Sequence, residues 1–273
     1  MTLVDELDDS ARRWTVQTSA GAMVWRAWGT GSPLVLLHGA SGAWSHWVGN
    51  VRALAARYRV LAPDMPGYGD SGECPEPHTA ERLAAFVAEG IDAVLPPPAV
   101  LDIAGFSLGG VIGGIAAAAL GDRVRRLVLI GPGGLDLPVA PAPSLVRPAD
   151  RHAVADVRAA HRENLHRLMI AHRDAVDDVA VEVQTRNVAR ARFRSGNIPV
   201  EGALRAALPA VRARMGAIYG ALDGFCGPYL EERRRLFERL QPGIDFRIIP
   251  GAGHWANYEA AEVVNAVVLE MLD

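Results

Sequence analysis

The chain has 273 residues, of which 50% are hydrophobic and 22% charged, so it is long enough for one large α/β domain or two small ones. Its formal net charge of −3 gives no electrostatic case for nucleic acid as a partner, and no stretch has the apolar length of a membrane span. The acidic start lacks the pattern of a secretory signal, and the two cysteines, Cys74 and Cys226, lack metal-type spacing. We therefore expect a cytoplasmic protein that acts away from membranes.

Short apolar runs alternate with helical patterns in the first half of the chain. We predict strands at 23–29, 33–39, 59–64, 99–105 and 124–132, and helices at 46–58, 79–95 and 108–120. Thr79 is the expected N-cap of the second helix, and the prolines at 96–98 end it. Because the strands are apolar on both faces and alternate with helices, they predict a mostly parallel sheet that is covered on each side.

The pattern changes at about Leu135, where a proline-rich stretch begins. From about residue 149 to residue 211 the chain has helical periodicity and no convincing strand. We interpret residues 135–211 as a helical lid, inserted into a core that is formed by residues 1–134 and 212–273. The alternation then resumes, with strands at 215–220 and 245–251 and helices at 229–240 and 259–272.

A serine stands where one of the predicted strands gives way to a helix. In "GFSLGG", Gly105 and Gly109 flank Ser107 at two residues on either side. A nucleophilic serine must be exposed, beside a base, and near donors that can hold an oxyanion. A sharp strand-to-helix turn exposes the side chain and directs the first helical amides at it, and flanking glycines relieve the crowded backbone. We therefore predict that Ser107 is a nucleophile, with an incidental turn serine as the alternative.

Four motifs together resemble the α/β-hydrolase superfamily. They are "LVLLHGASG" at 34–42, "DMPGYGDS" at 64–71, "GFSLGG" at 105–110 and "GAGHWANYE" at 251–259. The resemblance covers nearly the whole chain and implies an eight-stranded sheet, helices on both sides, and a helical lid after the sixth strand. It also implies a triad in the order Ser, acid, His, which this chain offers as Ser107, Asp223 and His254.

The resemblance assigns a role to each of these positions. His254 would be the general base, and Asp223 would hold its imidazole in one tautomer and stabilise the positive form. Asp136 is the reserve acid, and a structural histidine or an ordinary loop aspartate are the alternatives. The oxyanion hole would consist of the backbone amides of Ala40 and Leu108.

The segment after the base carries a more specific likeness. "GHWANYE" resembles "GHWxxxE" in hydrolases that cleave a carbon–carbon bond in meta-fission products of aromatic catabolism, which are vinylogous 1,5-diketones with a terminal carboxylate. In those enzymes a lid arginine binds the carboxylate, which a planar guanidinium recognises bidentately. The resemblance implies that Arg186 has this role, with Arg190 next, and that Trp255 lines the substrate pocket. The alternatives are a surface arginine and a tryptophan that only packs.

The resemblance thus predicts a serine hydrolase that cleaves a carbon–carbon bond in a meta-fission-type dienoate, but other features of the chain depart from that family. The carbon–carbon hydrolases usually carry Asn before the nucleophile, whereas this chain has Phe106 there, and their oxyanion loop is richer in Gly and Pro. Phe106, with Trp44 and Trp47, suits an apolar acyl pocket equally well, so a carboxylesterase, lactonase or thioesterase stays open. Ser41, in the expected oxyanion loop, is a further candidate for substrate contact.

We expect a small-molecule substrate and neither a cofactor nor a metal. The glycines around Ser107 do not form the G-x-G-x-x-G of a dinucleotide site. Lid helices in this superfamily often contribute to dimer contacts, so a homodimer is a candidate assembly. The remaining alternative is a non-catalytic, ligand-binding member of the fold, whose sign would be loss of the serine, the acid or the histidine; all three residue types are present.

Overall fold

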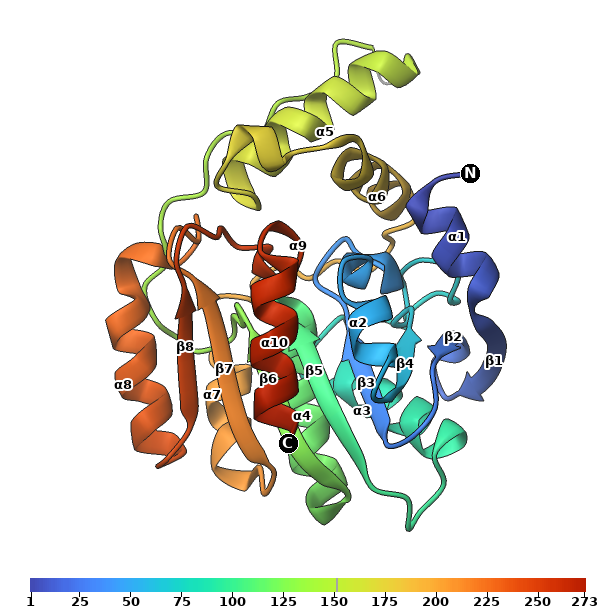
Figure 1. Cartoon of the computed structure of the whole chain (residues 1–273), viewed down its shortest axis with the longest axis vertical. Helices are drawn as coiled ribbons and strands as arrows, with labels where there is room; N and C mark the ends of the chain where they lie inside the picture. Colours follow the sequence, from blue (N-terminus) through green and yellow to red (C-terminus); the bar gives the residue numbers. More distant parts are fainter. Residues whose placement is uncertain (151) are drawn as a thin grey trace.

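A single eight-stranded sheet organises the chain in a computed structural model that describes residues 1–150 and 152–273 (Figure 1). The order is β1-β2-β4-β3-β5-β6-β7-β8. The first two pairings, β1 with β2 and β2 with β4, are antiparallel, and the pairings from β4 to β8 are parallel. The strands are β1 (Arg12–Thr18), β2 (Gly21–Trp28), β3 (Pro33–Leu37), β4 (Arg59–Pro63), β5 (Leu101–Phe106), β6 (Val124–Ile130), β7 (Arg214–Gly220) and β8 (Asp245–Ile249). The predicted α/β architecture with a mostly parallel sheet is confirmed.

Helices pack on both faces of this sheet. Buried side chains of α3 (Ala80–Val94), α4 (Leu108–Leu120), α7 (Ala203–Ala207) and α8 (Leu230–Leu240) join one core cluster. Those of α2 (Val51–Ala55), α9 (Ala256–Glu259) and α10 (Ala261–Leu272) join the other. Alternate residues of a single strand reach the two clusters, as Val35 and Leu37 do on one side and Leu34 and Leu36 on the other. This is why the central strands read as continuous apolar runs.

Two elements near the start of the chain were not predicted. Helix α1 (Leu3–Ser10) begins at a capping box, in which Thr2 accepts from the amide of Asp5 and the Asp5 carboxylate accepts from the amide of Thr2. Strand β1 lies at the edge of the sheet, where its residues alternate between exposed and partly buried. A short acidic helix and an edge strand with few apolar residues give only a weak periodic signal.

The chain between β6 and β7 contains α5 (Val154–Leu168), α6 (Asp178–Ala189) and α7. In Figure 1, α5 and α6 lie beyond the upper end of the sheet, with α1 beside α6. Helix α7 instead packs against α4, and its Leu204 joins the core cluster on that side of the sheet. We therefore use the term lid helices for α5 and α6 alone. In the described part of the chain, every helix falls short of the length and apolarity that crossing a bilayer requires.

Candidate active site

Ser107 occupies a strained turn between β5 and α4. Its backbone angles are φ 52° and ψ −117°, a region that residues with a side chain rarely adopt and that costs on the order of 1–3 kcal/mol. A Cβ at Gly105 would overlap the backbone of Gly109, and a Cβ at Gly109 would overlap the carbonyl of Leu37. The two glycines are therefore required by close approach of the backbone. The turn leaves the Ser107 side chain partly exposed, at the carboxyl end of a central strand.

The structure brings Ser107, Asp223 and His254 together from loops that follow three different strands. Nε2 of His254 lies 3.0 Å from Oγ of Ser107, and Nδ1 of His254 lies 2.7 Å from Oδ2 of Asp223. His254 is 7% exposed and Asp223 is 2% exposed, so the contact between them is buried, whereas the contact of His254 with Ser107 is partly buried. Because these distances are those of hydrogen bonds, the imidazole is placed to accept the proton of the serine hydroxyl while the carboxylate holds its other nitrogen.

Asp223 is held ionised although it is buried. Its Oδ1 accepts hydrogen bonds from the amides of Phe225, at 2.8 Å, and Cys226, at 3.2 Å. Burial alone would raise the pKa of this carboxyl, but the imidazole of His254 and the Phe225 amide outweigh it and hold the pKa below its ordinary value. The reserve acid, Asp136, instead forms an exposed ion pair with Arg205.

The two backbone amides that the sequence predicts as oxyanion donors have no hydrogen-bond partner in the described residues. Leu108 is the first residue of α4, and Ala40 lies in the loop after β3. Neither amide donates a hydrogen bond to any group within residues 1–150 and 152–273. Because a buried N–H is normally paired, the Leu108 amide, whose residue is only 1% exposed, is a donor without its partner. Both amides therefore remain the predicted oxyanion donors.

The aromatic residues expected to contact substrate are enclosed by protein. Phe106 and Trp255 are each 0% exposed. The Trp255 ring stacks on Tyr258 at 4.3 Å between centroids, and its Nε1 donates to the carbonyl of His46 at 3.0 Å. The Phe106 ring packs between the imidazoles of His46 and His254. Both rings therefore shape the site from behind its surface, without direct access to a ligand in this structure.

Ser41, the third expected substrate contact, differs from these two rings. It is exposed, and its backbone has φ 51°, which marks a tight turn in the loop after β3. Its exposure leaves the hydroxyl available to a ligand.

The two lid arginines bind carboxylates of the chain itself. Nη1 of Arg186 lies 2.8 Å from Oδ1 of Asp5 of α1, and its Nη2 lies 2.6 Å from Oε1 of Glu182, one turn earlier on α6. Arg190 lies 2.7 Å from Asp70. The expectation of a free guanidinium that awaits a substrate carboxylate is therefore not met, because both charges are already compensated.

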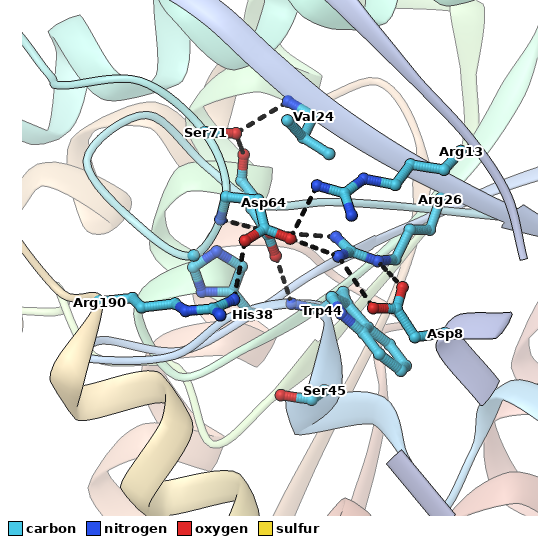
Figure 2. A network of polar contacts seen from close by, with 12 residues as sticks. Asp8, Arg13, Val24, Arg26, His38, Trp44, Ser45, Asp64, Ser71 and Arg190 are labelled. Atoms are coloured by element: carbon cyan, nitrogen blue, oxygen red, sulfur yellow. Dashed lines mark hydrogen bonds and ion pairs between the residues drawn. The ribbon is translucent and has the colours of Figure 1, made fainter. Parts of the chain in front are cut away.

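A buried ion-pair network supports the loops around the site (Figure 2). Asp64, 1% exposed, accepts from Arg26 at 3.0 Å and from the amide of Trp44 at 2.9 Å. Arg26 also reaches Asp8 of α1 and Asp70. The network thereby joins α1, β2, the loop after β3 and the loop after β4. The sequence analysis did not identify Arg26, because its partners are distant in the chain.

No group of three or more His, Cys, Asp or Glu side chains within the described residues has the arrangement of a metal site.

Comparisons with known proteins find a matching family model, related sequences and a solved structure. A family model described as "Alpha/beta hydrolase family" matches residues 34–267. The dihydrolipoyllysine-residue acetyltransferase component of the acetoin cleaving system of Pseudomonas putida is 29% identical over 262 residues, which cover 89% of this chain and 64% of that protein. The chain therefore spans less than two thirds of this relative. The 2-hydroxy-6-oxo-6-phenylhexa-2,4-dienoate hydrolase of Burkholderia cepacia is 26% identical over 265 residues, which cover 89% of this chain and 88% of that enzyme.

A solved structure has the same fold. The meta-cleavage product hydrolase CumD of Pseudomonas fluorescens IP01 superimposes with a TM-score of 0.76 and 22% identity, covering 95% of this chain and 97% of that one.

Proposed function

Because this chain belongs to the α/β-hydrolase family, we propose that it is a serine hydrolase in which Ser107 attacks a carbonyl carbon of a small-molecule substrate. One observation carries the proposal: the pair of contacts that joins Ser107 to His254 and His254 to Asp223. A serine within hydrogen-bond reach of a base, whose far nitrogen is held by a carboxylate, is the arrangement that acyl transfer requires.

The reaction follows from these positions. As Oγ of Ser107 bonds to the carbonyl carbon, Nε2 of His254 takes its proton, and the carbonyl oxygen becomes an oxyanion that accepts from the amides of Ala40 and Leu108. His254 then gives the proton to the leaving group as its bond breaks, and an acyl-enzyme remains. Water attacks this acyl group with His254 again as the base, which releases the acid and restores Ser107.

The geometry best supports a neutral ester, thioester or lactone as the substrate. Binding a terminal carboxylate requires an uncompensated cation, and both candidates for that role, Arg186 and Arg190, are ion-paired with carboxylates of the chain. Phe106, directly before Ser107, is buried and adds no charged or polar side chain to the site. An acyl group without charge meets fewer unpaired polar groups in such a site.

Hydrolysis of a carbon–carbon bond is the second candidate. The dienoate hydrolase of Burkholderia cepacia aligns with 89% of this chain, and this favours a meta-fission-type dienoate. His254 would first help to convert the dienol into its keto form, and Arg186 would bind the terminal carboxylate. That role requires Arg186 to release Asp5, its partner on α1.

A side-by-side assay separates the two candidates. Steady-state rates are measured on p-nitrophenyl butyrate and on 2-hydroxy-6-oxo-6-phenylhexa-2,4-dienoate, with Ser107→Ala as the blank. We expect Ser107-dependent turnover of the ester and a much smaller kcat/KM on the dienoate. A larger kcat/KM on the dienoate would overturn the ester assignment and establish the second candidate. Equal rates for the wild type and Ser107→Ala on both substrates would overturn the proposed mechanism itself.

A further inference from the structure

A second buried histidine lies next to the site and has no part in the mechanism above. His46 belongs to the short 3-10 helix η1 (Trp44–Trp47) and is 1% exposed. Its ring packs edge-on against Phe106 and Trp255, with centroids 5.5 Å and 5.2 Å away. Its Nδ1 lies 3.2 Å from the backbone nitrogen of Gly39. Because an amide can only donate, Nδ1 is the acceptor, and the proton of this imidazole sits on Nε2.

The carbonyl of Gly39 is held from another side by His38. Nδ1 of His38 lies 2.9 Å from the oxygen of Gly39, and Nε2 of His38 accepts from the amide of Met65 at 3.0 Å. The Met65 amide therefore fixes the tautomer of His38 that donates to Gly39. In a trans peptide the carbonyl oxygen and the following N–H point in opposite directions. Holding the Gly39 oxygen thus sets the direction of the Ala40 N–H.

Two histidines therefore hold the polar groups of the residue that precedes Ala40. A flip of the Gly39–Ala40 peptide would break the contact with His38, and a displacement of Gly39 would break the contact with His46. The chain is shaped for the second contact: Gly42 faces the His46 ring so closely that a Cβ there would overlap ring atoms. A side chain at this position would push the imidazole away from Gly39.

We propose that His46 is a positioning residue of the oxyanion hole, whose Nδ1 holds the Gly39 amide and so keeps the Ala40 amide directed at the carbonyl oxygen of the substrate. This inference rests on the proposed function, because it takes Ala40 as an oxyanion donor. The backbone carbonyl of His46 also accepts from Nε1 of Trp255 and Nδ2 of Asn257, which follow the proposed base. One residue thus links the loop of the oxyanion donor to the loop of His254.

The surroundings of His46 keep its ring neutral, as this role requires. Burial lowers the pKa of His46 to about 3, and the neighbouring His38 and His254 act in the same direction. A proton on Nδ1 would replace the acceptor by a second donor and break the contact with Gly39.

Two substitutions of His46 distinguish the loss of its hydrogen-bond acceptor from the loss of its side-chain volume. In His46→Asn, Oδ1 lies the same number of bonds from the backbone as Nδ1, so an acceptor can remain in place while volume is lost. In His46→Leu, most of the volume remains and the acceptor is gone. We expect kcat on p-nitrophenyl butyrate to fall about 100-fold in His46→Leu, at the lower end of the loss on removing an oxyanion donor. We expect KM to stay within about 2-fold, and kcat of His46→Asn to stay within about 5-fold of the wild type.

Ser45→Ala is the matched control. It removes a neighbouring hydroxyl that binds Asn187 of α6, leaves the Gly39 contact intact, and is expected to change kcat less than about 2-fold. A wild-type kcat in His46→Leu would overturn the inference, as would equal losses in the Asn and Leu variants or a change confined to KM.

Inhibition by an aryl boronic acid, which forms a tetrahedral adduct on an active serine, gives a readout that does not require turnover. His46→Leu should weaken this inhibition in proportion to its loss of kcat, and unchanged inhibition alongside a lower kcat would also overturn the inference.

The Ser107→Ala variant distinguishes failure of the proposed function from failure of the role of His46. Activity that persists in Ser107→Ala would overturn the proposed function. If Ser107→Ala is inactive and His46→Leu has normal activity, only the proposed role of His46 is overturned.

Discussion

Oδ2 of Asp223 lies 2.7 Å from Nδ1 of His254, while Oδ1 of the same carboxylate accepts from the amides of Phe225 and Cys226. The two oxygens of the carboxylate therefore have different roles, since Oδ1 fixes the carboxyl group to its loop and Oδ2 fixes the imidazole. The carboxylate can orient His254 only because the Phe225–Cys226 segment orients the carboxylate first.

Asp223→Asn should lower kcat by about 10⁴-fold with little change in KM, because an amide in this position favours the wrong tautomer of the imidazole. Steady-state rates on p-nitrophenyl butyrate test this. Asp136→Asn is the matched control, since its carboxylate is exposed and paired with Arg205, and it should keep nearly full activity. If Asp136→Asn lost activity and Asp223→Asn kept it, Asp136 would be the acid.

The stability of the protein should fall as the pH falls from neutrality, in part because of His46. The pKa of His46 is lowered from 6.5 to about 3 by burial, so between these values the unfolded chain binds a proton that the folded chain does not. Stability from the neutral ring is therefore complete above about pH 6.5 and decreases below it. One proton corresponds to about 1.4 kcal/mol per pH unit. Urea unfolding at pH 5 and 6 should show a pH slope that is smaller by about this amount in His46→Asn. An identical slope in both proteins would contradict the assignment.

Arg26→Leu should destabilise the fold by about 3–5 kcal/mol, because it leaves the buried carboxylate of Asp64 without its cation. Arg13 offers the control: it is about half exposed, pairs with Asp70, and its replacement by Leu should cost less than about 1 kcal/mol. Urea unfolding at pH 7 measures both. Similar losses of unfolding free energy in the two variants would contradict a special contribution of the buried Arg26.

Glu259 links the segment between the two lid helices to the loop of the proposed base, and Glu259→Gln should loosen that link. Its Oε2 accepts from the amides of Gly253, at 2.7 Å, and Ala171, at 3.0 Å, and its Oε1 accepts from the amide of His172 at 2.8 Å. Hydrogen bonds to a charged acceptor contribute about 1.5–3 kcal/mol, and an amide nitrogen cannot accept in place of an oxygen.

Hydrogen–deuterium exchange tests the prediction for Glu259. The amides of Ala171 and His172 should exchange faster in Glu259→Gln, whereas Glu262→Gln, which alters an exposed residue of α10, should leave them unchanged. Unaltered protection in Glu259→Gln would contradict a link through this carboxylate.

Much of the core could be predicted because its signals are local. The helix predicted at 108–120 is observed with those bounds, since Ser107 and Gly121 mark its ends. The helix predicted at 79–95 is confirmed at Ala80–Val94, with Thr79 as its cap. The single helix predicted at 46–58 was wrong: the chain forms the short η1 and then α2, with Gly49 and Asn50 between them. Glycine and asparagine both have poor helix propensity, but the apolar residues on either side of them keep a helical spacing, which predicted one continuous helix.

The residues that act through partners distant in the chain could not be predicted. Arg186 pairs with Asp5, which lies 181 residues earlier, so nothing in its own helix shows that its charge is compensated. Trp255 follows the base in sequence, but it is fully buried, with its indole nitrogen donating to the His46 carbonyl and its ring packed on Tyr258. His46 carries no motif and is identified only by its contact with Gly39. The role of each of these side chains depends on contacts with residues distant in the chain, and its residue type alone does not reveal that role.

Covalent labelling with a fluorophosphonate tests the central claim most directly, because it requires no knowledge of the natural substrate. The reagent adds to a serine only where a base and an oxyanion hole activate it. We predict one adduct per chain, located by peptide mass spectrometry at Ser107, with loss of esterase activity in proportion to labelling and no adduct in Ser107→Ala or His254→Ala. An unlabelled Ser107, or a labelled Ser107 in a protein that keeps its activity, would contradict the account.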